Sequence, residues 1–145
     1  MEIHRAKPEE AAMLTEIAFA AKRHWGYPEP WIQSWKEVLT IQPEFNLKHE
    51  TYTASIEGQV IGFYALGGEL NRSSLEHFWV LPGAMGQGVG RALFNHAVQR
   101  AKALGAQTIE IESDPNAQAF YERMGARQVS TKITDFEWGV ACCLC

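Results

Sequence analysis

One segment of this 145-residue chain constrains its fold more than any other. Residues 79–91, WVLPGAMGQGVGR, lead from an apolar β-type run through a glycine-rich turn into a strong helix pattern. Glycines 86, 88 and 90 carry no Cβ, so the backbone there can adopt unusual dihedral angles and present several N–H groups beside a helix N-terminus. Phosphate is the usual ligand of such a turn. The sequence therefore predicts a strand, a phosphate-binding turn and a helix in succession.

The charge pattern around this turn also favours an anion. Residues 77–109 contain no Asp or Glu, although carboxylates make up 17 of the 145 residues. Arg91 lies in the first turn of the predicted helix, where the helix dipole disfavours a cation unless an anion is bound nearby. The alternative is an ordinary glycine-rich loop whose charges are distributed by chance.

The spacing of the glycines separates the common phosphate-binding loops. A P-loop requires Gly-x-x-x-x-Gly-Lys-Ser/Thr, and this segment has neither the lysine nor the hydroxyl. The dinucleotide fingerprint requires Gly-x-Gly-x-x-Gly, whereas Gly86, Gly88 and Gly90 give Gly-x-Gly-x-Gly. An ATP-binding P-loop and a redox protein with a nicotinamide cofactor are both disfavoured.

Hydrophobic periodicity and turn residues predict one domain of mixed strands and helices over residues 1–145. A Pro8-Glu9-Glu10 start predicts a first helix, Pro30 precedes a second, and Gly105 ends the long helix that begins near Val89. The second helix is expected to bury Trp31, Trp35, Val38 and Leu39. A Glu57-Gly58 turn predicts a hairpin. The expected strands are 3–6, 50–56, 59–66, 75–81, 108–113, 129–134 and 136–144, with a short helix at 115–124.

Composition excludes several classes of protein. A net charge of −4 argues against a nucleic-acid partner, and the chain has no apolar run of 18 residues and no signal-peptide pattern. We expect a soluble, cytoplasmic protein with no membrane partner. Cys142, Cys143 and Cys145 crowd into the last four positions, which favours reduced thiols on a terminal strand over a disulfide framework or a metal site.

The motifs together resemble the GNAT superfamily of N-acetyltransferases, which use acetyl-coenzyme A. In that family a strand ends in Val-x-Pro, then come Arg/Gln-x-x-Gly-x-Gly/Ala, a long helix, a strand and Asn…Tyr-Glu-x-x-Gly. Here the corresponding segments are 80–82, 85–90 and 116–125, VLP, MGQGVG and NAQAFYERMG. The resemblance implies an α/β (α+β) fold with a mixed, mostly antiparallel sheet flanked by helices.

The resemblance also implies how the coenzyme binds. Met85 stands where the family usually has Arg or Gln, so backbone contacts are expected to dominate at the phosphates. In the family the strand at 78–80 splays from the strand at 109–113, a main-chain N–H near Val80 faces the thioester carbonyl, and the pantetheine arm pairs like an added strand. The residues expected to contact the coenzyme are Phe78, Trp79, Val80, Met85, Gly86, Gln87, Gly88, Val89, Gly90, Arg91, Asn116, Phe120 and Tyr121.

Acetyl transfer to an amine needs a proton donor for the departing thiolate and a base for the amine. The resemblance assigns the donor to Tyr121, whose phenol stays protonated at neutral pH; the alternative is a packing role beside Phe120. For the base we retain Glu112, at the end of its strand, Glu76, which burial on the face of Phe78 and Val80 would activate, and a chain of waters. His77, on the opposite face, is expected to be structural.

An aromatic segment, residues 22–31, is expected to roof the acceptor site in the resembling fold. Trp25, Tyr27 and Trp31 would form a wall that attracts an amine cation, or would instead cap the hydrophobic core. The predicted reaction is acetyl transfer from acetyl-CoA to a primary amine of a small molecule or peptide, without a metal. The alternative is an acyl-CoA-binding module of the same fold with little or no catalysis. Whether Asp114 or Asn116 takes the family's Asn position, and whether the chain forms a homodimer, stay open.

Overall fold

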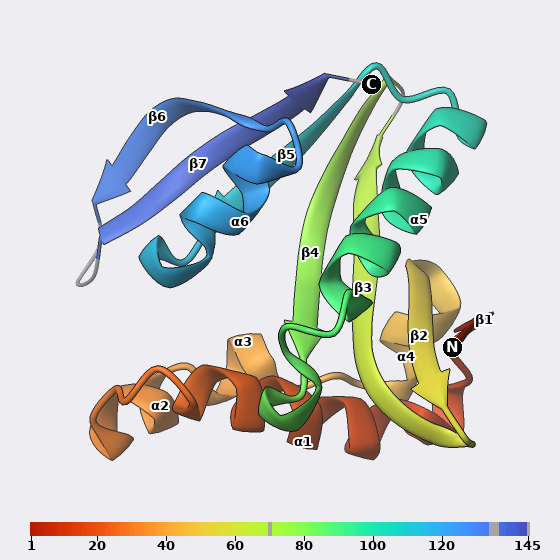
Figure 1. Ribbon diagram of the computed structural model, residues 1–145, viewed down its shortest axis with the longest axis vertical. Coiled ribbons are helices and arrows are strands. Elements are labelled where there is room, and N and C mark those ends of the chain that lie inside the picture. The colour runs from red at the N-terminus through yellow and green to blue at the C-terminus, as the bar shows by residue number, and fades with distance from the viewer. Residues whose placement is uncertain (70, 134–136, 145) are drawn as a thin grey trace. The chain divides into compact units, whose positions relative to one another are not determined.

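The computed structural model describes residues 1–69, 71–133 and 137–144 (Figure 1). Four successive helices lie between the first two strands, and short 3-10 turns precede α1, α5 and α6. In chain order the elements are β1 (Glu2–Arg5), α1 (Ala11–Arg23), α2 (Glu29–Ser34), α3 (Lys36–Leu39), α4 (Pro43–Lys48), β2 (Glu50–Ile56), β3 (Gln59–Glu69), β4 (Arg72–Val80), α5 (Val89–Ala103), β5 (Thr108–Ser113), α6 (Gln118–Arg123), β6 (Arg127–Ile133) and β7 (Glu137–Leu144).

The strands form a sheet in the order β1-β2-β3-β4-β5-β7-β6. β1 is antiparallel to β2, and β7 is antiparallel to both β5 and β6. β4 and β5 are parallel, with Arg72 to Leu75 opposite Thr108 to Ile111. This pairing involves only the first part of β4, which continues to Val80. The mixed, mostly antiparallel sheet flanked by helices is the one that the sequence predicted.

The chain divides into two compact units, and the prediction of one domain over residues 1–145 stays a prediction. The first unit comprises Met1–Ala65 and His77–Leu93, and the second comprises Leu66–Glu76 and Phe94–Cys145. β3, β4 and α5 each contribute residues to both units. Each unit has a buried apolar interior of its own.

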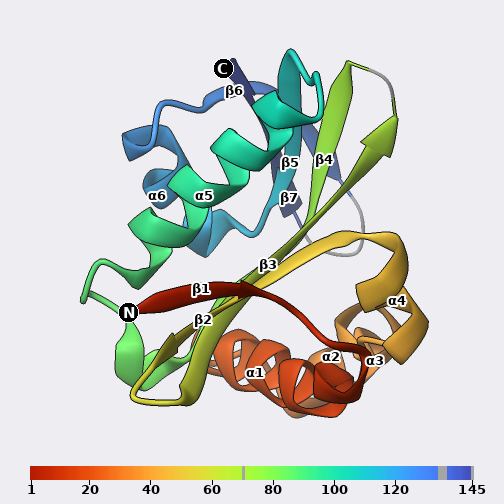
Figure 2. The ribbon, with the colours of Figure 1, turned by 90° about the vertical axis from the view of Figure 1, so that its right-hand side faces the viewer.

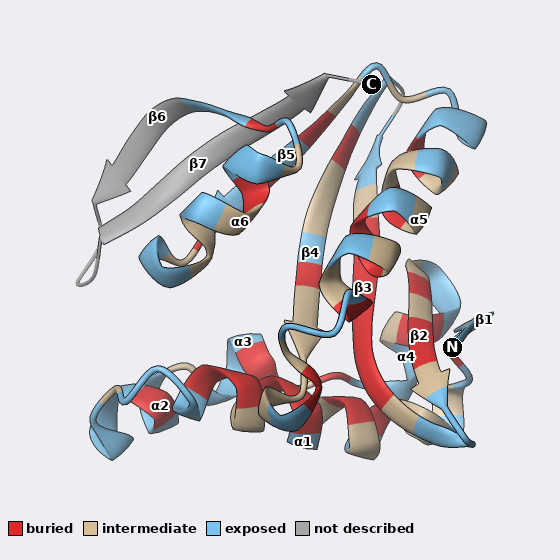
Figure 3. Ribbon diagram, viewed as in Figure 1, coloured by how far each residue is buried: buried red, intermediate tan, exposed pale blue. Residues whose placement is uncertain are grey.

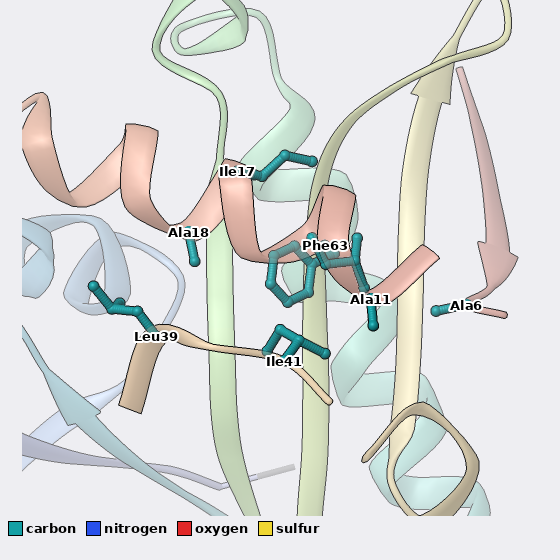
Figure 4. Packing of buried hydrophobic residues seen from close by; sticks show 8 residues of the cluster. Ala6, Ala11, Ile17, Ala18, Leu39, Ile41 and Phe63 are labelled. Carbon is teal, nitrogen blue, oxygen red and sulfur yellow. The ribbon is translucent and has the colours of Figure 1, made fainter. Parts of the chain in front are cut away.

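The interior of the first unit lies between α1 and the strands. Phe63 of β3 is fully buried among small and aliphatic side chains, including those of Ala11, Ile17 and Ile41 (Figure 4). α2 and α3 lie beside α1 (Figure 2). The alternation expected of a half-buried strand is replaced in β3 by a continuous buried run over residues 61–66 (Figure 3), as in strands covered on both faces.

The interior of the second unit contains Phe94 of α5, Ile109 and Ile111 of β5, and Tyr121 of α6, all of them buried. Buried and exposed residues alternate strictly from Ile109 to Ser113. This pattern is the period of two that places one strand face on the interior and the other toward solvent.

Several predicted elements are confirmed at or near their ends. The strand at 50–56, the strand at 108–113 and the helix that begins at Val89 are all present. Glu57 and Gly58 both have positive φ, 51° and 81°, as the tight hairpin turn between β2 and β3 requires. Of the two closing strands, Thr134, Asp135 and Phe136 lie outside the described residues, as does Cys145.

The second predicted helix is wrong in its length and in part of its buried face. α2 ends at Ser34 and α3 begins at Lys36. Trp31 and Val38 therefore lie on two separate helices, and their spacing does not define one buried helix face. Trp31 is 41% exposed and Val38 is 68% exposed. The region before Glu50 also contains α4, a helix that was not among the predicted elements.

Candidate functional site

The glycine loop, defined as residues 85–91, follows the 3-10 turn after β4 and includes the first turn of α5. Gly86 and Gly88 have φ values of 78° and 83°, in the left-handed region. A Cβ added at either position would meet nothing within 4 Å, so the dihedral angle and not crowding requires glycine there. The expected unusual backbone is confirmed at these two positions, whereas Gly90 lies within α5.

The N–H groups of residues 86–91 have no protein acceptor within the described part of the chain. On one side of the loop, the Ala84 N–H donates to the Leu81 carbonyl at 2.9 Å; on the other, the Ala92 N–H donates to the Gly88 carbonyl at 3.1 Å. Gly86, Gly88 and Arg91 are exposed. Consecutive available donors at a helix N-terminus, with a cation beside them, fit a diphosphate.

The strand before the loop is held close to β3. A Cβ on Gly62 would lie 2.9 Å from the Trp79 carbonyl oxygen and 3.4 Å from the Val80 Cα. The Leu81 N–H donates to the Ile61 carbonyl at 2.8 Å. Glycine at position 62 therefore allows β3 to approach β4 and fixes the entry into the glycine loop.

His77 is a buried, neutral residue of this strand. The Trp79 indole N–H donates to His77 Nδ1 at 3.0 Å, and the rings of Phe45 and Phe63 lie 5.4 and 5.9 Å from the imidazole. Burial, together with the charge of His49, lowers the pKa of His77 to about 4. These contacts agree with the structural role that the sequence analysis expected.

Tyr121 lies in the interior of the second unit. Its ring centroid is 5.3 Å from that of Phe120 and 5.9 Å from that of Phe94. Burial, and to a smaller extent the charge of Asp114, raises the pKa of Tyr121 above its usual value. The phenol is therefore protonated at neutral pH and can act as a hydrogen-bond donor.

Asp114 and Asn116, the candidates for the family's Asn position, are joined to each other. The Asp114 carboxylate accepts from the Asn116 backbone N–H at 2.9 Å and from its side-chain Nδ2 at 2.8 Å. Asp114 thereby caps the 3-10 turn at Pro115–Ala117. The cap orients the Asn116 amide directly before α6.

The carboxylates considered as bases lie on exposed strand positions. Glu112 is exposed between buried Ile111 and Ser113. Glu76 is also exposed, and its carboxylate accepts a hydrogen bond from the Ser74 hydroxyl at 2.5 Å. The burial expected for Glu76 is therefore wrong, because its side chain lies beside a polar neighbour on the same strand face and reaches solvent.

The aromatic segment forms a ring cluster, which we define as Tyr27, Trp31 and Trp35. The Tyr27 centroid is 6.1 Å from Trp31 and 5.1 Å from Trp35, and the two indoles are 6.5 Å apart. Trp25 packs on His24 instead, at 4.9 Å. The expected wall is thus divided: Tyr27 and Trp31 stand together, and Trp35 takes the place expected for Trp25.

The ring cluster already holds a cation of the protein. The Lys22 ammonium lies 4.4 Å from the Trp35 centroid and 4.9 Å from that of Tyr27, and Lys22 is 2% exposed. The sequence analysis did not consider Lys22. A signal was present, because Lys22 follows Ala18 by one helical turn on the apolar stripe of α1.

Comparison with known proteins identifies the family. A model of the acetyltransferase (GNAT) family matches residues 13–126. The chain belongs to the GNAT family. Members of this family transfer acyl groups from acetyl-CoA, so the chain is an acyltransferase, as the motifs predicted. None of the curated proteins compared with the chain matched its sequence significantly.

Solved structures similar to this GNAT chain have the same fold. A PaiA N-acetyltransferase from Thermoplasma acidophilum, in complex with coenzyme A, has a TM-score of 0.81 at 19% identity, with 99% of this chain and 98% of that chain covered. A GNAT acetyltransferase from Brucella melitensis, in complex with acetyl-CoA, has a TM-score of 0.71 at 22% identity, covering 99% and 86%. The ribosomal-protein-S18-alanine N-acetyltransferase of Escherichia coli has a TM-score of 0.71 at 21% identity, covering 97% and 90%.

Two surface hollows of the GNAT chain lie apart from the predicted site residues. One, of about 380 Å³, is lined by Gly68, Glu69, Asn71, Arg72, Ser74 and Glu110. The other, of about 370 Å³, lies along α1 and includes Phe19, Arg23 and Lys36. Among residues 1–69, 71–133 and 137–144, no group of three metal-ligand side chains is found, and no helix has the length and apolar character needed to cross a membrane.

Proposed function

We propose that this GNAT chain transfers the acetyl group of acetyl-CoA to a primary amine by direct attack. The observation that carries the proposal is the run of available N–H groups over residues 86–91, at the start of α5 in a chain of this family. Bonds from several amides to a diphosphate are charge-assisted and do not depend on a particular side chain. The presence of Met85 in place of Arg or Gln is therefore compatible with coenzyme binding.

Further contacts to the coenzyme are proposed along β4 and near α6. Phe78, Trp79 and Val80 are each half-buried, and the pairing of β4 with β5 ends before them, at Leu75. We propose that main-chain groups of residues 78–80 bind the pantetheine arm and orient the thioester carbonyl. Asn116 and Phe120 are proposed as side-chain contacts.

The acetyl donor supplies a thioester. Two proton transfers accompany the reaction, one from the acceptor amine and one to the departing thiolate. An acceptor amine with a pKa of about 10 is almost wholly protonated at pH 7, and only about one molecule in 10³ can attack the carbonyl. A base next to the amine raises that fraction. We propose Glu112 or Glu76, directly or through water, because both carboxylates are exposed and can reach a water chain.

Tyr121 is proposed to give a proton or hydrogen bond to the departing thiolate. Its raised pKa keeps the phenol protonated, and its burial limits competition from water for the hydrogen bond. The carbon–sulfur bond breaks as the new carbon–nitrogen bond forms, and the thiolate leaves as the free thiol of coenzyme A. This role needs no change of charge at Tyr121 before the reaction.

A coupled pair of measurements tests the proposal. Titration calorimetry with coenzyme A is expected to give saturable binding to the native chain. A panel of small-molecule and peptide amines, incubated with acetyl-CoA and assayed for free thiol, is expected to give turnover with at least one class. Binding without turnover across the panel would favour the alternative, a coenzyme-binding module, and absence of both would contradict the site assignment.

A further inference from the structure

The last part of β4 extends beyond its pairing with β5. β4 runs from Arg72 to Val80, and the pairing with β5 ends at Leu75. On the other edge the chain stays against β3, because the Leu81 N–H donates to the Ile61 carbonyl at 2.8 Å. A strand segment that extends past one of its neighbours needs other contacts to keep its main chain in a fixed position.

The main-chain groups of this segment alternate between the two edges. In an extended strand the N–H and C=O of one residue point to the same edge, and those of the next residue point to the opposite edge. The Trp79 carbonyl lies toward β3, since a Cβ on Gly62 would be 2.9 Å from its oxygen, and the Leu81 N–H also points to β3. Val80, between them, therefore points its N–H and C=O to the edge away from β3.

Trp79 is fixed through its side chain as well. Its indole N–H donates to His77 Nδ1 at 3.0 Å, and its half-buried ring packs against the interior of the first unit. An indole N–H can only donate, so Nδ1 of His77 carries no proton and the neutral imidazole is protonated at Nε2. Trp79 is thus constrained at its main chain by the close approach of Gly62 and at its indole by His77.

His77 is itself held in place by rings from two other elements. It is buried, and its ring centroid lies 5.4 Å from that of Phe45 in α4 and 5.9 Å from that of Phe63 in β3. His49 stacks on the other partner of this group, Phe45, at 3.8 Å. A buried acceptor with such neighbours has little freedom to move, so the position of the Trp79 indole is determined by the interior of the first unit.

We propose that His77 and Trp79 are positioning residues for acetyl transfer: their hydrogen bond fixes the main chain at Val80, so that the Val80 N–H meets the thioester carbonyl. The inference rests on the proposed function, which places the coenzyme along residues 78–80. A donor to the developing oxyanion has to be held within about 0.5 Å of its productive position. Trp79 acts on the coenzyme through Val80 in this account, because its own carbonyl points to β3.

The test compares two substitutions of the same shape at position 77. Asn offers an acceptor oxygen in the place of Nδ1, whereas Leu has the same branching without an acceptor. With acetyl-CoA, the best amine of the panel and a free-thiol assay, His77→Leu should lower kcat by about tenfold and His77→Asn by less than about threefold. The Kd of coenzyme A, which lacks the acetyl carbonyl, should change by less than about threefold in both variants.

A double-mutant cycle tests whether the two residues act through one bond. Trp79→Phe removes the donor and keeps an aromatic ring, and it should lower kcat about as much as His77→Leu. The double variant should be no slower than either single variant, because the same hydrogen bond is lost in all three. His49→Leu removes the ring that stacks on Phe45 and should keep the wild-type kcat, which controls for general loosening around His77.

Exchange of the Trp79 indole proton with deuterium, followed by NMR, tests the bond without catalysis. The resonance is identified by its absence from Trp79→Phe. Exchange should be slow in the wild type and in His77→Asn, and fast in His77→Leu. Fast exchange in the wild type would overturn the inference even if no variant at position 77 folds.

The kinetic outcomes separate this inference from the proposed function. Equal kcat in His77→Leu and His77→Asn, wild-type kcat in Trp79→Phe, additive losses in the double variant, or an equal loss in His49→Leu would each overturn it. All of these leave the acetyltransferase proposal intact, because the wild type still turns over. Absence of turnover by the wild type with every amine rejects the proposed function, and the positioning inference with it.

Discussion

The glycine loop and the ring cluster, the two proposed binding surfaces, are built in opposite ways. In the glycine loop the groups offered to a ligand are main-chain N–H groups, and the positive φ of Gly86 and Gly88 makes them available. In the ring cluster the groups are side chains from the connection between α1 and α2, from α2 and from the residue between α2 and α3, and their packing makes the surface. We expect the first surface to tolerate changes of side chain and not of backbone, and the second to tolerate changes of backbone and not of side chain.

The largest effect is expected from a backbone change in the glycine loop. Gly88→Val places a β-branched residue at a φ of 83°, which an L-residue with a branched Cβ adopts only under strain. Loss of two or three charge-assisted bonds would weaken coenzyme A binding by about a thousandfold. Calorimetry measures the affinity, and circular dichroism checks the fold.

Gly83→Ala is the matched control in the same connection, because a Cβ there meets nothing within 4 Å and its φ is not positive. Its affinity should equal that of the wild type. Wild-type affinity in Gly88→Val would remove the phosphate assignment of the glycine loop.

Lowering the pH should destabilise the fold through the buried side chain of His77. The pKa of His77 is lowered to about 4 by burial, against about 6.5 for an exposed histidine. Below pH 6.5 His77 binds a proton in the unfolded chain but not in the folded chain. The free energy of unfolding should therefore fall as the pH drops from 6.5 to 4. The loss approaches about 3 kcal/mol, and urea unfolding at pH 7 and pH 4.5 measures most of it.

His77→Phe should flatten this pH dependence, whereas His4→Gln, at an exposed position of β1, should keep it. An equally steep loss of stability in His77→Phe would show that other groups cause the acid sensitivity.

A side-chain change at the proposed proton donor should alter turnover and spare binding. Tyr121→Phe removes the phenol and keeps the ring between Phe94 and Phe120. We expect kcat to fall by about a hundredfold and the coenzyme affinity to change by less than about threefold. Stopped thiol assays and calorimetry measure the two quantities separately.

Tyr64→Phe, at a fully buried position of β3, controls for the loss of a tyrosine hydroxyl from an interior. Wild-type turnover in Tyr121→Phe would leave Tyr121 with a packing role only.

The smallest effect is expected from a side-chain change in the glycine loop. Gln87 donates from Nε2 to the Gly83 carbonyl at 3.1 Å and is exposed. Because the main chain of the loop is proposed to bind the phosphates, Gln87→Ala should change coenzyme A affinity by no more than about threefold. A loss as large as that in Gly88→Val would show that the loop depends on its side chains, and the contrast with the ring cluster would then disappear.

Local sequence was sufficient for the elements whose form depends on adjacent residues. Glu57-Gly58 specifies a tight turn, strict alternation specifies β5, and the glycines after Pro82 specify the loop of positive φ before α5. These features follow from φ preferences and side-chain periodicity, which act within a few residues. The family could be assigned from the same motifs, because each is a run of neighbouring residues.

The prediction of the second helix was wrong because its interruption is not marked by any local sequence signal. Trp31, Trp35 and Val38 have helical spacing, and no local signal marks the break between Ser34 and Lys36. Ile32 of α2 is buried, and Leu39 of α3 packs in the interior of the first unit with residues of α1 and with Phe63 of β3. Such contacts are not specified by any local pattern. Exposure of Glu76 was missed similarly, because alternation along β4 does not say which face is covered.

The sequence by itself determined a GNAT chain with a glycine loop of positive φ before a long helix, since glycine conformations and short motifs are encoded by neighbouring residues. Only the tertiary structure decided that the Lys22 ammonium lies over the rings of Tyr27 and Trp35, that Trp25 packs on His24 instead of joining them, and that His77 is buried and neutral. Each of those facts depends on contacts between side chains of different elements, and no local sequence pattern specifies the energy of such contacts.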